Sequence, residues 1–226
     1  AFIGDVILAT PVIEAINNNL ENAKIDFALR AGNETLFNNH PHINNILVWN
    51  KKQNKYKNLL KLLLLIRSNK YNIVINLQRF ASTGFLTALS GSKCKIGFSK
   101  NPFSFTFTHK IKHQWGNTTH ETQRNLMLLM PLLGKTTAPV KLYPAQIHFL
   151  NTQKYKSQKY ICAAPTSVWF TKQLPLKKWV DFFNIINPKL NVYLLGAKSD
   201  YKTCEQIIDK SINKNIVNLA GKLSFL

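Results

Sequence analysis

The chain alternates short apolar runs with amphipathic segments, and this alternation restricts the fold more than any other feature of the sequence. Residues 71–77 and 160–164 are largely apolar runs, typical of buried strands. Each run is followed by a loop and then by a segment with apolar residues at helical spacing. Strands that alternate with helices predict parallel sheets covered by helices. We therefore expect an α/β protein built from two doubly wound halves.

The same patterns predict the individual elements. Strands are predicted at residues 24–30, 46–49, 71–77, 93–98, 160–164, 192–195 and 216–219. Helices are predicted at residues 5–20, 56–68, 120–133, 176–186 and 201–210, with another that ends near Ser90. Pro11 lies inside the first helical pattern and is expected to kink it. Residues 99–115 show no helical period and are predicted to form a long, partly ordered loop of a kind that often binds a ligand.

Residues 135–158 contain two prolines and mixed polar residues, so we expect the domain boundary there. The first domain is predicted to span residues 1–150 and the second residues 151–226. The second has about half of the five or six strands of a doubly wound sheet. No strand precedes the first helix either. We therefore expect a fragment of a longer protein, with an incomplete second domain.

The net charge of +20 indicates a polyanionic partner, such as nucleic acid, anionic lipid or a phosphorylated glycan. Lysine is abundant throughout the chain, so the charge by itself does not choose among them. No helix-turn-helix, zinc-finger or aromatic RNA-binding pattern is found, and we expect no nucleic-acid partner. We interpret the basic outer face of the helix at residues 56–68 as solvated. Peripheral contact with anionic membrane lipids is the alternative.

The cysteines indicate a reducing, cytoplasmic location. Cys94, Cys162 and Cys204 are far apart, without the paired spacing of a zinc site or a disulfide framework. Cys162 lies in an apolar run and is expected to be a small core residue. We find no apolar run long enough to span a bilayer and no signal peptide.

The loop at residues 165–175 is a candidate anion site, because it joins a predicted strand to a predicted helix. Backbone N–H groups and a helix N-terminus gather at such a loop, which here also offers Thr166, Ser167 and Lys172. A polar loop that caps the helix is the alternative. Arg79 follows another buried strand and is a candidate anion ligand or a solvated arginine. Asp5 has the position of a helix cap.

An ordered set of motifs resembles the ADP-heptose:lipopolysaccharide heptosyltransferases. The motifs are at residues 4–11, 40–43, 75–78, 95–98, 120–126, 165–175, 195–200 and 219–222. Each is weak alone, but together they cover nearly the whole chain in the family's order. The resemblance implies two facing Rossmann-like domains, the glycosyltransferase B architecture. It also implies inverting transfer of heptose from ADP-heptose to the lipopolysaccharide inner core, the lipid A–Kdo region.

The resemblance also implies roles for individual residues. Asp5 matches the proposed base that deprotonates the acceptor hydroxyl, and Lys172 matches a lysine that contacts the donor diphosphate. Thr166 and Ser167 would bind phosphate oxygens. The loop from Gly196 to Asp200 would lie near the nucleoside.

On the acceptor side, the resemblance implies that Arg79, Lys95 and Arg124 would bind the anionic inner core. The family needs no metal and no cofactor beyond the donor substrate. The family's last donor-binding loop would lie beyond Leu226, so the fragment itself is expected to be inactive or nearly so. The alternatives are the same fold acting on another nucleotide sugar, and a non-catalytic basic protein that binds anions or nucleic acid.

Overall fold

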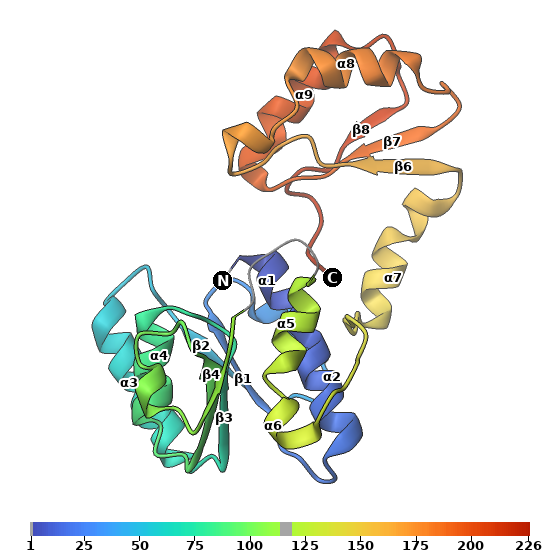
Figure 1. Ribbon diagram of the computed structural model, residues 1–226. Coiled ribbons are helices and arrows are strands. Elements are labelled where there is room, and N and C mark those ends of the chain that lie inside the picture. The colour runs from blue at the N-terminus through green and yellow to red at the C-terminus, as the bar shows by residue number, and fades with distance from the viewer. Residues whose placement is uncertain (1, 114–118) are drawn as a thin grey trace. The chain divides into compact units, whose positions relative to one another are not determined.

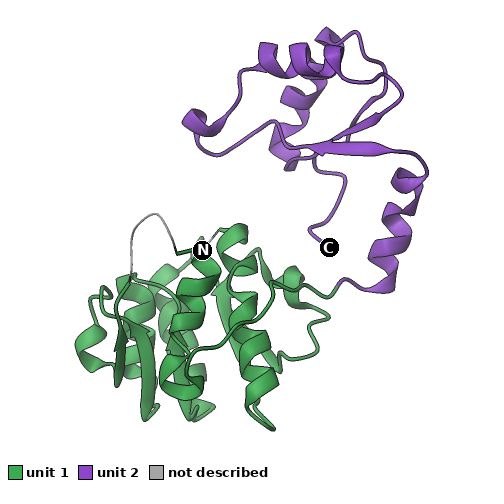
Figure 2. Cartoon of the chain, turned by 45° about the vertical axis from the view of Figure 1, so that its right-hand side comes forward, with its two compact units in different colours: residues 1–143 green, residues 144–226 purple. Residues whose placement is uncertain are grey.

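The computed structural model describes residues 2–113 and 119–226. The chain forms two compact units, residues 1–143 and 144–226 (Figure 2). The boundary lies within the stretch 135–158 that the sequence indicated, seven residues before the expected end of the first domain at 150. Helix α7 (Gln146–Gln153) therefore belongs to the second unit.

Unit 1 begins with two helices where the sequence predicted one kinked helix. Helix α1 (Ile3–Ile7) ends before helix α2 (Thr10–Asn19), and Pro11 lies in the first turn of α2. Proline has no N–H to donate to the carbonyl four residues earlier, that of Ile7. The hydroxyl of Thr10 donates to this carbonyl oxygen instead, at 2.8 Å. The break separates Asp5 in α1 from the buried helix that follows.

The strands of unit 1 pair in parallel. Strand β1 (Asp26–Arg30) pairs with β2 (Asn45–Trp49), and a second sheet has the order β3-β4-β5. The latter contains β3 (Ile73–Asn76), β4 (Cys94–Phe98) and β5 (His109–Ile111), with Ile75 opposite Ile96. The prediction of a long, partly ordered loop at residues 99–115 was wrong in part, because this stretch contains β5. Strand β5 has only three residues, two of them exposed and polar, so it lacks an apolar pattern. Trp115, at the end of that stretch, lies outside the described residues.

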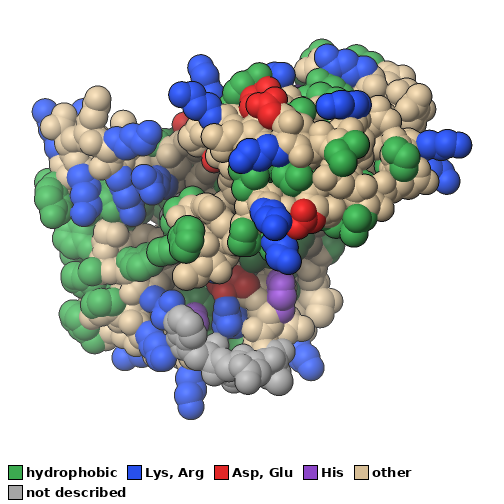
Figure 3. Space-filling view, turned by 90° about the horizontal axis from the view of Figure 1, so that it is seen from above, with side chains coloured by type: hydrophobic (Ala, Val, Ile, Leu, Met, Phe, Trp, Pro, Cys, Tyr) green, Lys and Arg blue, Asp and Glu red, His purple; other side chains and the backbone are tan. Residues whose placement is uncertain are grey.

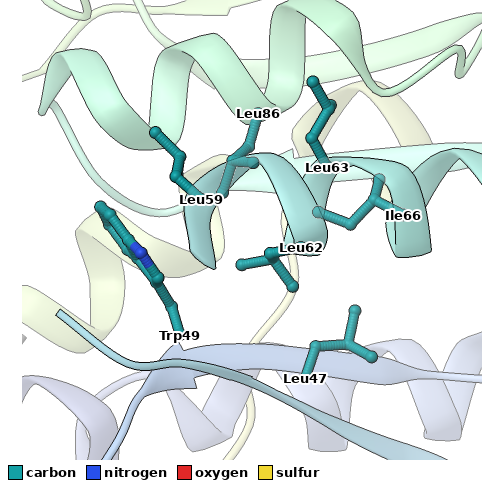
Figure 4. Packing of buried hydrophobic residues seen from close by; sticks show 7 residues of the cluster. All are labelled: Leu47, Trp49, Leu59, Leu62, Leu63, Ile66 and Leu86. Carbon is teal, nitrogen blue, oxygen red and sulfur yellow. The ribbon is translucent and has the colours of Figure 1, made fainter. Parts of the chain in front are cut away.

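Helices cover the β3-β4-β5 sheet on both faces (Figure 1). Helices α2, α5 (Glu121–Met127) and α6 (Met130–Leu133) bury Leu126, Leu128 and Leu129 against one face. Helices α3 (Lys55–Ser68) and α4 (Ala81–Leu89) lie on the opposite side. Figure 4 shows the core there: Leu59, Leu62, Leu63 and Ile66 of α3 pack against Leu47, Trp49 and Leu86. Because the three strands are parallel, their carboxyl ends lie along one edge of this sheet.

Unit 2 repeats the same pattern in a parallel sheet of order β6-β7-β8. Its strands are β6 (Tyr160–Ala163), β7 (Asn191–Leu194) and β8 (Ile216–Asn218). Helices α8 (Leu176–Ile185) and α9 (Tyr201–Lys210) bury Phe183 and Ile207 against one face (Figure 1). Cys162 was expected in the core but is exposed, because its side of β6 faces away from these helices.

The segment that ends unit 1 is fastened to helix α2 by a buried carboxylate. Glu14 is only 4% exposed, and its two oxygens accept the Tyr143 hydroxyl at 2.9 and 3.0 Å. Nearby, the Lys141 N–H donates to the Thr10 hydroxyl at 3.1 Å. His40 Nε2 lies 3.6 Å from a Glu14 oxygen, and the His40 ring packs on the Tyr143 ring. These contacts fix the chain as far as Tyr143, the last residue of unit 1.

We predict that Tyr143→Phe destabilises unit 1 by about 1–3 kcal/mol, because Glu14 stays buried without its hydroxyl donor. The measurement is the urea unfolding transition of unit 1. Tyr155→Phe is the control, since the Tyr155 ring packs on Tyr193 and no described residue bonds its hydroxyl. Equal transitions for Tyr143→Phe and the unmodified chain would show that the fastening contributes nothing.

The same cluster predicts a pH dependence of stability. Burial holds the pKa of His40 below its ordinary value of 6.5, and the Glu14 carboxylate offsets this only in part. The unfolded chain therefore takes up a proton near pH 6.5 while the folded chain does not. His40 thus makes the free energy of unfolding fall as the pH drops below about 6.5. Measured from pH 7.5 to 5.5, this fall should be smaller in His40→Gln and unchanged in His109→Gln, which alters an exposed histidine. An equal fall in His40→Gln would contradict the prediction.

Candidate functional site

The carboxyl ends of the unit 1 strands bring four basic side chains together. Arg79 follows β3, Lys100 follows β4 and His113 follows β5, while Arg124 lies in α5. His113 is buried, and its ring packs edge-on against Phe98 at 4.7 Å. Burial holds the pKa of His113 below its ordinary value, and the charges of Arg79, Arg124 and Lys100 lower it further. This edge of unit 1 is therefore a site of concentrated positive charge.

The loop that carries Arg79 is held in place by a buried amide. Asn101 donates to the carbonyl oxygens of Gln78 and Phe80, on either side of Arg79, at 3.1 Å each. Its own carbonyl oxygen accepts the N–H of Phe103 at 2.9 Å. Gly84 allows this approach, because a Cβ at that position would lie 2.0 Å from the Asn101 oxygen. The backbone around Arg79 is thus fixed by contacts from the next strand's loop.

Arg124 is partly neutralised by its own helix. Its guanidinium pairs with the Glu121 carboxylate and donates to the Thr119 carbonyl oxygen at 3.3 Å. The neighbouring Asn125 donates to the Leu8 carbonyl oxygen at 3.0 Å, which fastens α5 to the end of α1. The helix with Asp5 and the helix with Arg124 therefore lie side by side (Figure 1).

Asp5 is the third residue of α1 and not its cap as the sequence predicted, because the helix begins at Ile3 and its N-cap is Phe2. One of its oxygens, Oδ2, accepts the Phe2 N–H at 2.9 Å, and the side chain is exposed. Within the described residues, Oδ1 has no hydrogen-bond partner. The carboxylate is thus oriented by the backbone and open to a ligand.

Lys95 lies apart from this edge. It is the second residue of β4, and its ammonium donates to the Ala88 carbonyl oxygen at 2.7 Å, near the C-terminal end of α4. Because α4 runs back across the sheet, that end lies at the amino ends of the strands. The structure therefore does not bring Lys95 together with Arg79 and Arg124.

In unit 2, the loop after β6 presents hydroxyls and a lysine. The Ser167 hydroxyl accepts the Trp169 N–H at 3.2 Å, and the Gln173 amide donates to the Ser167 carbonyl oxygen. A 3-10 turn at Phe170–Lys172 then exposes Lys172, which has no ion pair with any described residue. Thr166 and Ser167 are half-buried at the base of the loop. The loop can thus offer two hydroxyls and one cation to an anion.

The loops after β7 and β8 reach the same edge and touch each other. The Gly221 N–H donates to the Gly196 carbonyl oxygen at 2.9 Å, and a Cβ on Gly221 would lie 2.7 Å from the Lys198 Cα. Gly221 has a φ of +71°, which glycine adopts without strain. Asp200 Oδ2 accepts the Ala197 N–H at 2.7 Å, so this carboxylate caps its own loop. Gly196 and Asp200 thus shape the edge next to the Thr166 loop.

Sequence reasoning missed three residues that shape the unit 1 site: Lys100, Asn101 and His113. The pair Asn101–Pro102 marks a turn after the predicted strand at 93–98, and this could have indicated a structured loop. Nothing local marks His113, because its role depends on a strand of only three residues.

In the described part of the chain, no three His, Cys, Asp or Glu residues are grouped so as to hold a metal ion. Nor does this part contain a helix both long and apolar enough to cross a membrane.

Comparison with known sequences identifies the family. Residues 59–226 match the model of glycosyltransferase family 9 (heptosyltransferase). Lipopolysaccharide heptosyltransferase 3 of Escherichia coli is 32% identical over 243 residues, which cover 99% of this chain and 70% of that protein. Lipopolysaccharide heptosyltransferase 1 of Campylobacter coli is 28% identical over 241 residues, with 98% and 70% covered.

Solved structures agree on the fold. A family 9 glycosyl transferase from Veillonella parvula has a TM-score of 0.85 at 19% identity, covering 99% of this chain and 67% of that one. The Escherichia coli heptosyltransferase WaaC with ADP has a TM-score of 0.76 at 16% identity, covering 97% and 72%. The fold is thus the expected glycosyltransferase B architecture of two Rossmann-like domains, and the coverage fits a second domain represented in part. The chain belongs to glycosyltransferase family 9 (heptosyltransferase), a family of enzymes that transfer glycosyl groups.

Proposed function

We propose that this chain is the acceptor-binding domain and part of the donor-binding domain of an enzyme that transfers heptose from ADP-heptose to the lipopolysaccharide inner core. The observation that carries the proposal is that one chain contains both a candidate base and a candidate ligand for the diphosphate. Unit 1 presents an oriented carboxylate near a cationic edge, and unit 2 presents a lysine and hydroxyls on a strand-to-helix loop. The named lipopolysaccharide heptosyltransferases among its relatives support the choice of sugar and acceptor.

In unit 1, we propose Asp5 as the base of an inverting displacement. The acceptor hydroxyl oxygen attacks the anomeric carbon while its proton passes to Asp5, and the bond from that carbon to the diphosphate oxygen breaks. The Phe2 N–H holds one carboxylate oxygen and leaves the other for the acceptor. Arg79 and Arg124 would bind anionic groups of the acceptor. Lys95, tied to Ala88, is not part of this proposal.

In unit 2, we propose that Lys172 binds the diphosphate as negative charge grows on the leaving ADP. A cation stabilises the charge that grows on such a leaving group, and Lys172 is not paired with a carboxylate of any described residue. Thr166 and Ser167 would donate hydroxyls to phosphate oxygens. Gly196 and Asp200 would border the nucleoside, with Asp200 acting through the loop that it caps.

Because Lys172 would supply the charge that a divalent metal supplies in other transferases, we predict that transfer needs no added metal. Initial rates of ADP release should be equal with millimolar EDTA and with magnesium. A rate abolished by EDTA and restored by magnesium would overturn this assignment without affecting the choice of donor.

The test of function uses this chain within a protein of the full length of its relatives. ADP release is followed with ADP-heptose and a heptose-deficient lipopolysaccharide acceptor. Asp5→Asn should lower kcat by about 10²–10⁴-fold, because the hydroxyl loses its base. Lys172→Ala should lower it by about 10²–10³-fold, because the leaving group loses its cation. The control variants Asp209→Asn and Lys210→Ala alter exposed charges at the C-terminal end of α9, away from Asp200, and should retain activity.

Three outcomes would contradict parts of this proposal. Full activity of Asp5→Asn and Lys172→Ala would remove the assigned roles and leave the reaction intact. Release with a different nucleotide sugar, and none with ADP-heptose, would keep the fold and replace the donor. No acceptor-dependent release with any nucleotide sugar would contradict the activity itself.

An acceptor carried by lipid A is anchored in a membrane. We therefore also propose that the enzyme works in the cytoplasm at a membrane surface. We propose that this contact is peripheral.

A further inference from the structure

Helix α3 has leucines on both of its faces, and only one face is needed for the core. Leu59, Leu62, Leu63 and Ile66 fill the core shown in Figure 4. On the outer face, Tyr56 is 73% exposed, Leu60 53%, Leu64 66% and Leu65 46%. Tyr56, Leu60 and Leu64 are spaced four residues apart, so they form one row along the helix. The described structure leaves this apolar row uncovered.

Cations surround this apolar row. Lys57 and Lys61 lie on the outer face beside Leu60 and Leu64, and Arg67 follows one turn later. The sequence contains no aspartate or glutamate between Glu34 and Glu121, and none of these three cations forms an ion pair with a described residue. In Figure 3, hydrophobic and Lys or Arg side chains lie next to one another on the left side, which carries α3. The face is thus apolar and strongly positive together.

Two concave features extend this face. Between β2 and the outer face of α3 there is a groove of about 330 Å³, lined by Val48, Leu62, Leu65 and Lys61 with two asparagines. At the C-terminal end of α3 there is a pocket of about 300 Å³ that holds Arg67, Lys70 and Lys93. None of these three cations has an ion pair with a described residue.

The beginning of the helix also concentrates positive charge. Lys51 lies 4.0 Å above the Trp49 ring, and Lys55 lies 5.2 Å from the Tyr56 ring. Burial and the charges of Arg30 and Lys55 hold the pKa of Lys51 below its ordinary value. Like charges that crowd in this way favour an anionic partner.

We propose that the outer face of α3 docks on an anionic lipid bilayer, with the leucines entering the headgroup region and the surrounding cations meeting lipid phosphates. A bilayer interface accepts both features, because lysine stems lie along apolar surface while their ammonium groups reach the headgroups. Nucleic acid would use the cations but would not require the exposed leucines.

The basic pocket at the end of α3 lies away from the candidate site of unit 1. The basic pocket lies where β3 and β4 begin, at Ile73 and Cys94. Arg79 and His113 follow the opposite ends of their strands. This pocket therefore lies at the opposite edge of the β3-β4-β5 sheet from the candidate site of unit 1. The docking surface does not depend on the proposed transfer, since a chain that transfers nothing would still bind vesicles.

The experiment measures co-sedimentation of the chain with vesicles of phosphatidylglycerol and phosphatidylethanolamine, or of phosphatidylcholine alone. We expect binding to the anionic vesicles only, weakened but not abolished by 0.5 M salt, a concentration at which charge contacts are largely screened. Leu60→Ser with Leu64→Ser should lower the apparent affinity by about tenfold or more, through lost apolar insertion. Lys57→Gln with Lys61→Gln should lower both the affinity and its salt dependence.

A matched pair tests the location. Ile147 and Leu150 of α7 are each 54% exposed, so Ile147→Ser with Leu150→Ser removes similar apolar area elsewhere and should retain binding. Thermal unfolding checks that each variant is folded. As a readout without mutation, anionic vesicles should slow hydrogen exchange in α3 of the unmodified chain.

The proposal is overturned if anionic vesicles do not bind the chain, or if the leucine pair binds as the unmodified chain does. It is also overturned if only the α7 pair loses binding. Tight, salt-sensitive binding of arbitrary DNA that is unaffected by the leucine changes, together with no vesicle binding, would assign the face to nucleic acid.

Discussion

Parallel strand pairing is the constraint on which the rest of this structure depends. Two parallel strands cannot be joined by a tight turn, so the chain must cross back over the sheet before the next strand begins. Every strand pairing in the described part of the chain is parallel, and helices such as α4, α8 and α9 make the crossings. As a consequence, loops distant in the sequence meet at the carboxyl edge of each sheet. Arg79 and His113 meet in this way in unit 1, and Gly196 and Gly221 meet in unit 2.

Cations gathered at one edge repel one another. The structure reduces this repulsion at some of these residues more than at others. Glu121 neutralises Arg124 from within the same helix, and burial together with nearby positive charge keeps His113 from taking up a proton easily. Asn101 contributes no charge but fixes the backbone on both sides of Arg79. A site built this way is preorganised for an anion, because its backbone is held before the ligand arrives. The Lys172 loop differs, since its lysine is exposed and held by few contacts.

The two faces of α3 show how one helix can serve both stability and recognition. Its inner leucines supply much of the core beneath β2 and α4, as Figure 4 shows. Its outer leucines contribute little to folding, because they remain in contact with water in the described structure. Two other contacts satisfy polar groups over very different distances along the chain. At the Pro11 break the Thr10 hydroxyl donates to the Ile7 carbonyl oxygen within one turn, whereas the buried Glu14 carboxylate accepts the hydroxyl of the distant Tyr143.

The α/β class, most of the helices and strands, and the family to which the motifs belong were all predictable from the sequence alone. Periodicity and turn residues are local properties, so the runs at 71–77 and 160–164 were recognisable without coordinates. Which side chains meet was decided by the tertiary structure. Strand β5 is too short to show a pattern, and it exists because β4 offers it an edge to pair with. Lys95 was grouped with Arg79 by motif order, yet strand register and the Ala88 carbonyl place it at the opposite edge. The burial of Glu14 likewise depends on Tyr143, 129 residues later, a long-range pairing that no local pattern contains.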